Sequence, residues 1–296
     1  MEKFIEDYIT KQNIELEEWY EKAIKELPVS EDINIIENIP YMEDGNMRHT
    51  MDIYYSLDSE SNRPVLISYH GGGLVSGDKK YNRWFCSKMA AKGFLVICIA
   101  YPIVPEADVY TLLRDAYTGL KKAVDVASEY KGDTDNISIC GDSAGGFVAT
   151  YVCAIHHNKS IADALGIKQF TASINALISI SGMFYSSKLD KHGIRVLRKY
   201  FYGKRCKSHP FWSYVNPENS SVYESLPRML CITSKADYIK DYTLKYVKHL
   251  QNNKRSVRMV FYRENKELVH DFVILRPQYE ETEDAIEKIC EFITQM

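Results

Sequence analysis

A serine flanked by small residues is the first candidate for chemistry in this chain. The segment Gly141-Asp142-Ser143-Ala144-Gly145 has the spacing G-x-S-x-G. An apolar run ending at Cys140 predicts a strand before it, and Gly146 to Ala149 predicts the start of a helix after it. A strand-to-helix turn this tight strains the serine backbone, needs small neighbours and lifts the hydroxyl above the sheet. We therefore predict that Ser143 is a nucleophile, against the alternative of an ordinary glycine-rich connection.

Three consecutive glycines follow a second predicted strand. His70-Gly71-Gly72-Gly73 comes directly after the apolar run Val65 to Tyr69. A backbone without side chains can approach a ligand closely and turn two N–H groups toward one point. A phosphate-binding loop would require a following lysine and serine or threonine, and the dinucleotide fingerprint has another spacing. With a nucleophilic serine in the same chain, an oxyanion hole explains this loop best.

A histidine that takes the proton of the serine should follow it, because turns of this kind belong to triads in the chain order serine, acid, histidine. Five of the six later histidines are predicted to lie on helices or in a segment without strands: His156, His157, His192, His209 and His249. His270 instead follows the last predicted strand, in a loop. We predict that His270 is the general base, and that activity rises as a group with a pKa of about 6 to 7 loses its proton.

The acid that orients the histidine should follow the preceding strand, Met229 to Thr233. Asp237 and Asp241 are both available there. Asp237 is nearer the end of the strand, whereas Asp241 is expected to cap the next helix. We therefore favour Asp237 over Asp241. If neither is the acid, the next candidates are Asp271 and Glu264.

These motifs together resemble the hormone-sensitive-lipase-like carboxylesterases of the α/β-hydrolase superfamily. The resemblance runs from Pro64 to the end of the chain and rests on these segments: His70-Gly71-Gly72-Gly73, Gly77, Tyr101, Pro105-Glu106 and Gly141-Asp142-Ser143-Ala144-Gly145-Gly146. It implies hydrolysis of a carboxylic ester through an acyl-enzyme, with no metal and no cofactor. It also implies that the N–H groups of Gly72, Gly73 and Ala144 bind the oxyanion.

The same resemblance extends to the predicted acid and the predicted histidine. Asp237 matches the first aspartate of the family, and His270 with Phe272 resembles its histidine-x-phenylalanine segment. Two positions depart from the family pattern. Glycine is usual where this chain has Asp271, and arginine is usual where this chain has Pro102, directly after Tyr101. We expect these departures to affect the substrate more than the mechanism.

The elements that must position these residues alternate between strands and helices. Extended stretches at 34–39 and 48–55 predict an antiparallel hairpin at a sheet edge. Further on, strands are predicted at 65–69, 94–100, 137–140, 174–181, 229–233 and 257–262, and helices at 81–92, 109–130, 144–156, 242–252 and 280–294. Fully apolar strands alternating with helices predict an α/β fold, with a mainly parallel central sheet flanked by helices, in a single domain over 1–296.

The insertion 183–224, which has no strand pattern, predicts a helical cap over the sheet, and the family resemblance implies that residues 1–30 join it. Both are rich in aromatic rings: Trp19, Tyr20, Phe184, Tyr185, Phe201, Tyr202, Phe211, Trp212 and Tyr214. We predict that these rings close a narrow pocket for short acyl groups of about two to six carbons. The alternative is that they only pack the cap onto the sheet.

The insertion is also basic, which predicts a solvated face or, alternatively, attraction of an anionic substrate or surface. Its cationic residues are Lys188, Lys191, Arg195, Arg198, Lys199, Lys204, Arg205 and Lys207. The whole chain nevertheless carries a net charge of -3 with a pI near 6.3, so nucleic acid is not an expected partner. The expected partner is a small-molecule ester, and the oligomeric state is left open, a homo-oligomer included.

Localisation is predicted to be cytoplasmic. The N-terminus MEKFIEDYITKQ lacks an apolar signal core, and no apolar run is long enough for a membrane span. The seven cysteines are dispersed without metal-ligand spacing, which predicts reduced core thiols and makes a cysteine nucleophile a minor alternative.

Other function classes weigh less than an esterase. The same triad would suit an amidase or peptidase, and the same fold would suit a noncatalytic small-molecule receptor. A complete set of serine, acid and histidine argues against the receptor, and a strained serine argues against a purely structural protein.

Overall fold

The computed structural model describes residues 32–57, 62–188 and 192–295, together with residues 7, 9–11, 13–15, 17–18, 21–22, 27 and 29. An eight-stranded sheet in the order β1-β2-β4-β3-β5-β6-β7-β8 forms its centre. The strands are β1 (Ile33–Pro40), β2 (Thr50–Ser56), β3 (Arg63–Tyr69), β4 (Leu95–Ile99), β5 (Gly132–Asp142), β6 (Ile174–Ile180), β7 (Arg228–Ser234) and β8 (Val257–Tyr262).

The direction of the strands follows the sequence prediction. β2 is antiparallel to both β1 and β4, and all other neighbouring strands are parallel. The predicted edge hairpin and the mainly parallel sheet are therefore confirmed. β4 is buried along its whole length, as expected for an apolar strand covered on both faces.

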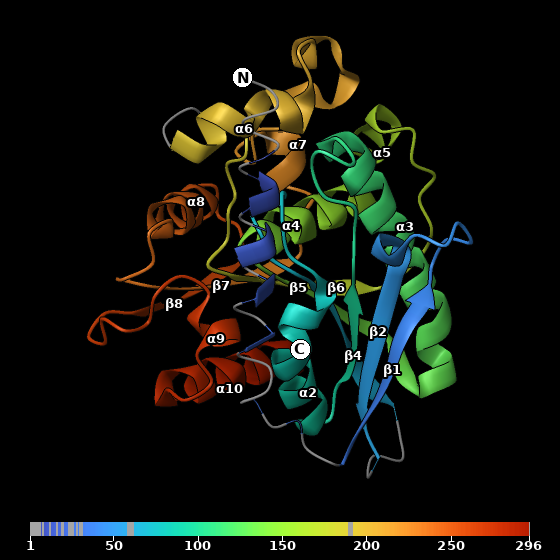
Figure 1. Cartoon of the computed structure of the whole chain (residues 1–296), viewed down its shortest axis with the longest axis vertical. Coiled ribbons are helices and arrows are strands. Elements are labelled where there is room, and N and C mark those ends of the chain that lie inside the picture. Colours follow the sequence, from blue (N-terminus) through green and yellow to red (C-terminus); the bar gives the residue numbers. More distant parts are fainter. Residues whose placement is uncertain are drawn as a thin grey trace.

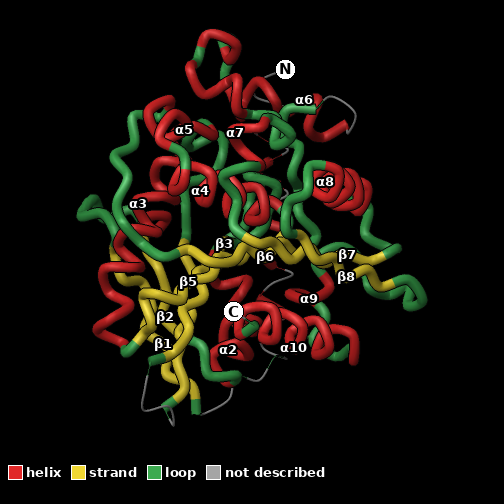
Figure 2. Tube along the Cα trace, turned by 180° about the vertical axis from the view of Figure 1, so that it is seen from behind, coloured by secondary structure: helices red, strands yellow, loops and turns green. Residues whose placement is uncertain are grey.

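Helices cover both faces of the sheet. They are α2 (Arg83–Ala91), α3 (Val109–Ala127), α4 (Ala144–His157), α5 (Lys159–Ala164), α6 (His192–Tyr202), α7 (Ser220–Tyr223), α8 (Lys240–Asn252), α9 (Phe272–Leu275) and α10 (Glu280–Thr294). Figure 2 shows α3, α4, α5 and α8 on one side of the sheet, with α2, α9 and α10 on the other. This arrangement forms two cores, because alternate residues of a strand point to opposite faces. Val65 and Ile67 belong to the first core, and Leu66 belongs to the second.

Local capping explains where α3 starts, the longest of the helices whose bounds are described. The Asp108 side chain accepts a 2.8 Å hydrogen bond from the Thr111 N–H at the start of α3. An aspartate at this position satisfies one of the first N–H groups of a helix, which have no intrahelical acceptor. α3 then buries an apolar stripe that includes Leu112, Leu113, Ala116 and Leu120.

The insertion contains α6 and α7, with the short 3₁₀ turns η4 (Cys206–Ser208) and η5 (Pro210–Tyr214) between them. Its described residues include no strand, as predicted. Figure 1 places α6 and α7 at the end of the molecule opposite α10. Five of its rings are buried in the same core as α3 and α4: Phe184, Tyr185, Phe201, Tyr202 and Phe211. Trp19 and Tyr20, which we predicted to join them, lie outside the described residues, so the two-part cap stays a prediction.

No helix in the described ranges is both long and apolar enough to cross a membrane. Five of the seven cysteines are buried, including Cys98, Cys140 and Cys231 in β4, β5 and β7, and none of the seven forms a disulfide. Burial raises the pKa of Cys140, Cys153 and Cys231 above the usual thiol value. These thiols therefore lack the thiolate character of a nucleophile.

Candidate active site

Three predicted site residues come from loops at the same edge of the sheet. Ser143 lies between β5 and α4, Asp237 between β7 and α8, and His270 between β8 and α9. The carboxyl ends of neighbouring parallel strands meet at one edge, which is where ligands bind in open α/β sheets. The strand order therefore brings together residues separated by up to 127 positions in the chain.

The serine turn is strained and held from several sides. Ser143 has φ 49° and ψ −114°, a conformation that residues with side chains rarely adopt. Its N–H donates to the Ile180 carbonyl at 2.8 Å, and its carbonyl accepts from the Met183 N–H at 2.8 Å. A side chain on Gly145 would come within 2.0 Å of the Tyr69 carbonyl oxygen. The small residues of G-x-S-x-G are thus required by close backbone contacts.

The structure brings the predicted serine, histidine and aspartate into one hydrogen-bonded chain. Ser143 Oγ lies 2.8 Å from His270 Nε2, and His270 Nδ1 lies 2.8 Å from Asp237 Oδ1. Ser143 and Asp237 are buried, and the His270 side chain is 15% exposed. The ring of Tyr238 lies 4.6 Å from the His270 ring, and Tyr238 itself is exposed.

The carboxylate of Asp237 is held in its ionised form. Burial alone would raise its pKa, but hydrogen bonds from His270, the Ile239 N–H and the Thr233 hydroxyl lower that pKa below its ordinary value. An ionised acid on Nδ1 keeps the neutral histidine in the tautomer that leaves Nε2 free to accept a proton.

Two of the other acid candidates, Asp241 and Glu264, lie outside the site. We expected Asp241 to cap α8, and this is wrong: α8 begins at Lys240, its N-cap is Ile239, and Asp241 is exposed in the first turn. The Asp237 carboxylate accepts the Ile239 N–H at 2.9 Å, so it supplies the first hydrogen bond of this turn. Glu264 is exposed in the loop after β8.

Asp271 also contacts His270. From the sequence, we considered this residue only as an alternative acid in place of Asp237. Its Oδ2 lies 3.1 Å from His270 Nε2, the same nitrogen that faces the serine. Burial raises the pKa of Asp271, and the charge of His270 opposes that rise. In return, the charge of Asp271 and the hydrogen bonds of both aspartates raise the pKa of His270 above its usual range, against the effect of burial. The sequence feature that could have indicated this contact is Asp271 itself, which stands where the resembled family usually has glycine.

The glycine loop presents N–H groups at the same edge. The Gly72 carbonyl accepts hydrogen bonds from Val75 N–H at 3.2 Å and Ser76 N–H at 2.9 Å, inside the turn. In a planar trans peptide the N–H points opposite to the carbonyl, so the Gly73 N–H points out of the turn. His70 Nδ1 lies 2.7 Å from the Gly71 carbonyl, which directs the Gly72 N–H outward by the same geometry. Gly72 has φ +116° and Gly73 has φ +63°, conformations that suit glycine.

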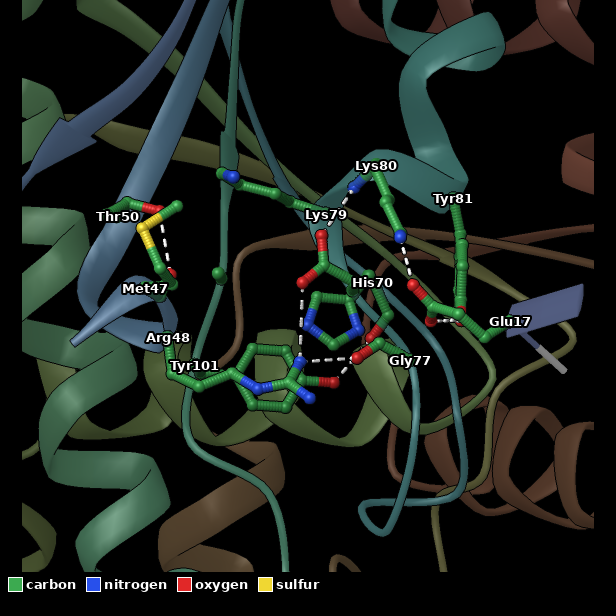
Figure 3. Close-up of polar contacts among 12 residues, drawn as sticks. Glu17, Met47, Arg48, Thr50, His70, Gly77, Lys79, Lys80, Tyr81 and Tyr101 are labelled. Atoms are coloured by element: carbon green, nitrogen blue, oxygen red, sulfur yellow. Dashed lines mark hydrogen bonds and ion pairs between the residues drawn. The ribbon is translucent and has the colours of Figure 1, made fainter. Parts of the chain in front are cut away.

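A buried support fixes this loop from behind. The rings of His70 and Tyr101 stack at 4.2 Å, and the Tyr101 hydroxyl donates to the His70 carbonyl at 2.5 Å. Arg48 donates to the Gly77 carbonyl at 2.6 Å, closing the far end of the loop (Figure 3). Burial lowers the pKa of His70 to about 4, so its ring is neutral and serves structure. The motif residues Tyr101 and Gly77 thus help to hold the glycine loop in place.

A further carboxylate, Asp142, lies directly before the serine. Burial and the charge of Asp271 raise its pKa to about 8, although a hydrogen bond from Asn82 opposes the rise. The sequence predicted neither the contact with Asn82 nor the raised pKa of Asp142. Asn82 and Asp142 are 60 positions apart, and only the fold brings them together.

Two other histidines, His156 and His209, have structural partners. His156 lies 3.2 Å from the Tyr117 hydroxyl and 3.1 Å from the Ala172 carbonyl. His209 stacks on Tyr110 at 3.6 Å. Within the described ranges, no group of three or more His, Cys, Asp or Glu side chains is arranged to hold a metal ion.

Comparison with known proteins agrees with this architecture. A family model described as alpha/beta hydrolase fold matches residues 66–274. A probable isoprenylcysteine alpha-carbonyl methylesterase of Arabidopsis thaliana is 26% identical over 145 residues, which are 49% of this chain and 30% of that protein. A putative alpha/beta hydrolase of Acanthamoeba polyphaga mimivirus is 26% identical over 227 residues, 72% of this chain and 62% of that protein. The chain therefore spans less than two thirds of either relative.

Solved structures share the fold at lower identity. Esterase B from Lactobacillus rhamnosis superposes with a TM-score of 0.92 and 18% identity, covering 99% of this chain and 95% of that chain. An esterase from Pyrobaculum calidifontis gives a TM-score of 0.74 and 20% identity, covering 96% and 92%. The family model spans most of the chain, and its range includes the motifs around Ser143 and His70. The chain therefore belongs to the alpha/beta hydrolase fold family, among the hormone-sensitive-lipase-like carboxylesterases.

Proposed function

We propose that this protein hydrolyses carboxylic esters with Ser143 as the nucleophile. The observation that carries the proposal is the hydrogen-bonded chain from Ser143 Oγ through both nitrogens of His270 to Asp237, with two contacts of 2.8 Å. A serine hydroxyl is a weak nucleophile until a base takes its proton, and this geometry supplies the base and the group that orients it.

In the proposed mechanism, Ser143 Oγ attacks the ester carbonyl while its proton passes to His270 Nε2. Asp237 stabilises the resulting imidazolium through Nδ1. The imidazolium then gives its proton to the leaving alkoxide, and an acyl-enzyme remains on the serine. Water, deprotonated by His270, releases the acid and restores the serine.

The negative charge on the carbonyl oxygen needs donors that are already in place. We assign this role to the N–H groups of Gly72, Gly73 and Ala144. The outward direction of the two glycine N–H groups and the position of Ala144 at the first residue of α4 support the assignment. Removing one such donor costs about 3 kcal/mol of transition-state stabilisation in a comparable hydrolase.

We also propose a preference for short acyl groups. The insertion contributes Phe201, Tyr202 and Phe211 to the core that contains Ala144, the residue after the nucleophile. Esterase B, which shares this fold, was solved with a C4-C4 tributyrin phosphonate. The buried state of these rings equally fits packing of the insertion onto the sheet, so the acyl preference has to be measured.

The test is turnover of p-nitrophenyl esters from acetate to palmitate, each below its micelle concentration, with Ser143→Ala as the control. Wild-type protein should react with an organophosphonate at Ser143, and the variant should lose turnover on the order of 10⁶-fold. Absence of labelling in the wild type would reject the nucleophile. A kcat/KM higher for palmitate than for butyrate would reject the acyl preference alone, and faster cleavage of matched anilides would point to an amidase.

A further inference from the structure

Asp271 places a second carboxylate on His270, at the nitrogen that faces the serine. Its Oδ2 lies 3.1 Å from Nε2, while Ser143 Oγ lies 2.8 Å from the same atom. Asp237 occupies the opposite nitrogen, Nδ1, at 2.8 Å. Both nitrogens of one imidazole therefore face a carboxylate.

The contact between Asp271 Oδ2 and His270 Nε2 determines how many protons the two side chains must hold together. A neutral histidine has one N–H, and here Nδ1 donates it to Asp237, which leaves a lone pair on Nε2. A lone pair and a carboxylate oxygen are both acceptors, so a 3.1 Å contact between them is unfavourable unless a proton lies in it. The proton resides either on Nε2, giving an imidazolium between two carboxylates, or on Oδ2 of Asp271.

The electrostatics of the pair agree with a shared proton. The charge of Asp271 raises the pKa of His270, although burial opposes it, and burial raises the pKa of Asp271. The other groups that face the pair come from neighbouring elements: Asp237 and Tyr238 after β7, and Asp142 at the end of β5. Among the described residues, no hydrogen-bond donor contacts Asp271 Oδ1.

We infer that Asp271 is a positioning residue that, together with His270, binds one proton in addition to the Nδ1–H in the resting protein, and that this additional proton must be lost before His270 can serve as the base. The inference rests on the proposed function. In the step itself, the Nε2–H bond breaks, its electron pair stays on Nε2 and the proton passes to water. The Ser143 Oγ–H proton can then pass to Nε2 as Oγ bonds to the ester carbonyl carbon.

The backbone holds Asp271 in place without using its charge. The residue has φ 55° and ψ 31°, and its N–H donates to Ser181 Oγ at 3.2 Å. Ser181 in turn donates its N–H to the Ile232 carbonyl at 2.8 Å. Asparagine and glycine adopt this left-handed conformation readily, so Asp271→Asn and Asp271→Gly should remove the charge and keep the loop.

The experiment is an NMR titration of the His270 ring in the wild type, Asp271→Asn and Asp271→Gly, with the signal assigned by its loss in His270→Gln. Glu267→Gln is the matched control, because Glu267 is an exposed carboxylate in the same loop. We expect the pKa of His270 to fall by about one unit or more in both Asp271 variants, since a neighbouring charge shifts a pKa by about 1 to 3 units. It should not change in the control.

The pH profile of ester turnover provides the second measurement. The acid limb of kcat/KM should move to lower pH in both variants, with up to about tenfold more activity, relative to the plateau, at a pH one unit below the wild-type midpoint. An unchanged or raised pKa of His270 in both variants would overturn the inference. The titration needs no substrate, so a protein that hydrolyses no ester would reject the proposed function and still decide the role of Asp271.

Discussion

Asn82 donates a 2.6 Å hydrogen bond to the carboxylate of Asp142, the residue immediately before the candidate nucleophile. The backbone of Gly71, at the start of the glycine loop, lies against the same carboxylate and helps to lower its pKa. One buried acid thus joins the serine turn, the glycine loop and η2 (Lys79–Asn82), the turn that leads into α2. The arrangement of the site therefore depends on a group that can gain or lose a proton.

Asp142→Asn should change how the stability of the protein depends on pH. The pKa of Asp142 in the folded protein is about 8, against an ordinary value of 3.8, so between these values the folded state holds a proton that the unfolded state lacks. The stability from this proton is complete below pH 3.8 and is lost as pH rises through about 8. The variant has no such proton to lose.

The measurement is thermal unfolding of both proteins at pH 5, 7 and 9. The Tm of Asp142→Asn relative to wild type should increase with pH, corresponding to a free-energy change of about 4 kcal/mol between pH 5 and 8. Parallel curves would mean that Asp142 is ionised in the folded protein throughout this range.

Asp237→Asn should reduce kcat by about 10⁴-fold, the effect of the same change in a comparable triad. Asparagine keeps the shape of the side chain but cannot stabilise the imidazolium at Nδ1. The matched control is Asp241→Asn, which removes an exposed carboxylate from the first turn of α8 and should cost a few tenths of a kcal/mol in stability. Equal and mild effects of the two changes on kcat would show that another residue is the acid.

Turnover by the wild type should rise with pH through a midpoint above the ordinary histidine value of about 6.5. The sign follows from the mechanism, because the base must be neutral, and from the carboxylates, which raise the pKa of His270 despite its burial. The measurement is kcat/KM from pH 5 to 10. A flat profile between pH 5 and 8, or a midpoint below 6, would contradict a histidine base flanked by two acids.

Gly72→Ala should remove most ester turnover, because a Cβ there would lie 2.0 Å from the Ser76 carbonyl oxygen and force the loop to move. Displacing one oxyanion donor costs about 10² to 10³-fold in kcat. Gly45→Ala is the control: Gly45 also has a positive φ of +73°, but its Cβ would meet no atom within 4 Å. Activity and circular dichroism of both variants separate backbone strain from loss of the oxyanion site, and comparable turnover in both would remove Gly72 from the proposal.

Much of the site could be predicted because its signals are local. Gly141 to Gly145 needs small residues wherever a strand turns sharply into a helix, and the three glycines after β3 need only their own backbone freedom. Apolar strands alternating with helices then imply a parallel sheet, whose carboxyl ends lie together. The proximity of Ser143, Asp237 and His270 was therefore predictable from their order and from the strand that each one follows.

The position of Asp241 was predicted wrongly because helix boundaries depend on competing hydrogen bonds. The expected capping role presumed that α8 begins after Asp241, but the carboxylate of Asp237 accepts the Ile239 N–H and the helix begins at Lys240. From the sequence alone, Asp237 could not be recognised both as the partner of His270 and as the acceptor for the Ile239 N–H. Both contacts depend on how the loops after β7 and β8 lie in space.

The tertiary structure alone decided the protonation of the site. The chain shows Asp142 and Asp271 only as acids next to a serine and a histidine. The pKa of Asp142 depends on burial, on Asp271 and on Asn82, which comes from a distant turn. The pKa of Asp271 depends on burial, on His270 and on Asp237. Residue types and their order determine which groups can react. Whether those groups carry a proton depends on distances of a few ångströms between segments that the chain order keeps apart, because electrostatic interactions in a buried site change steeply with distance and solvent exclusion.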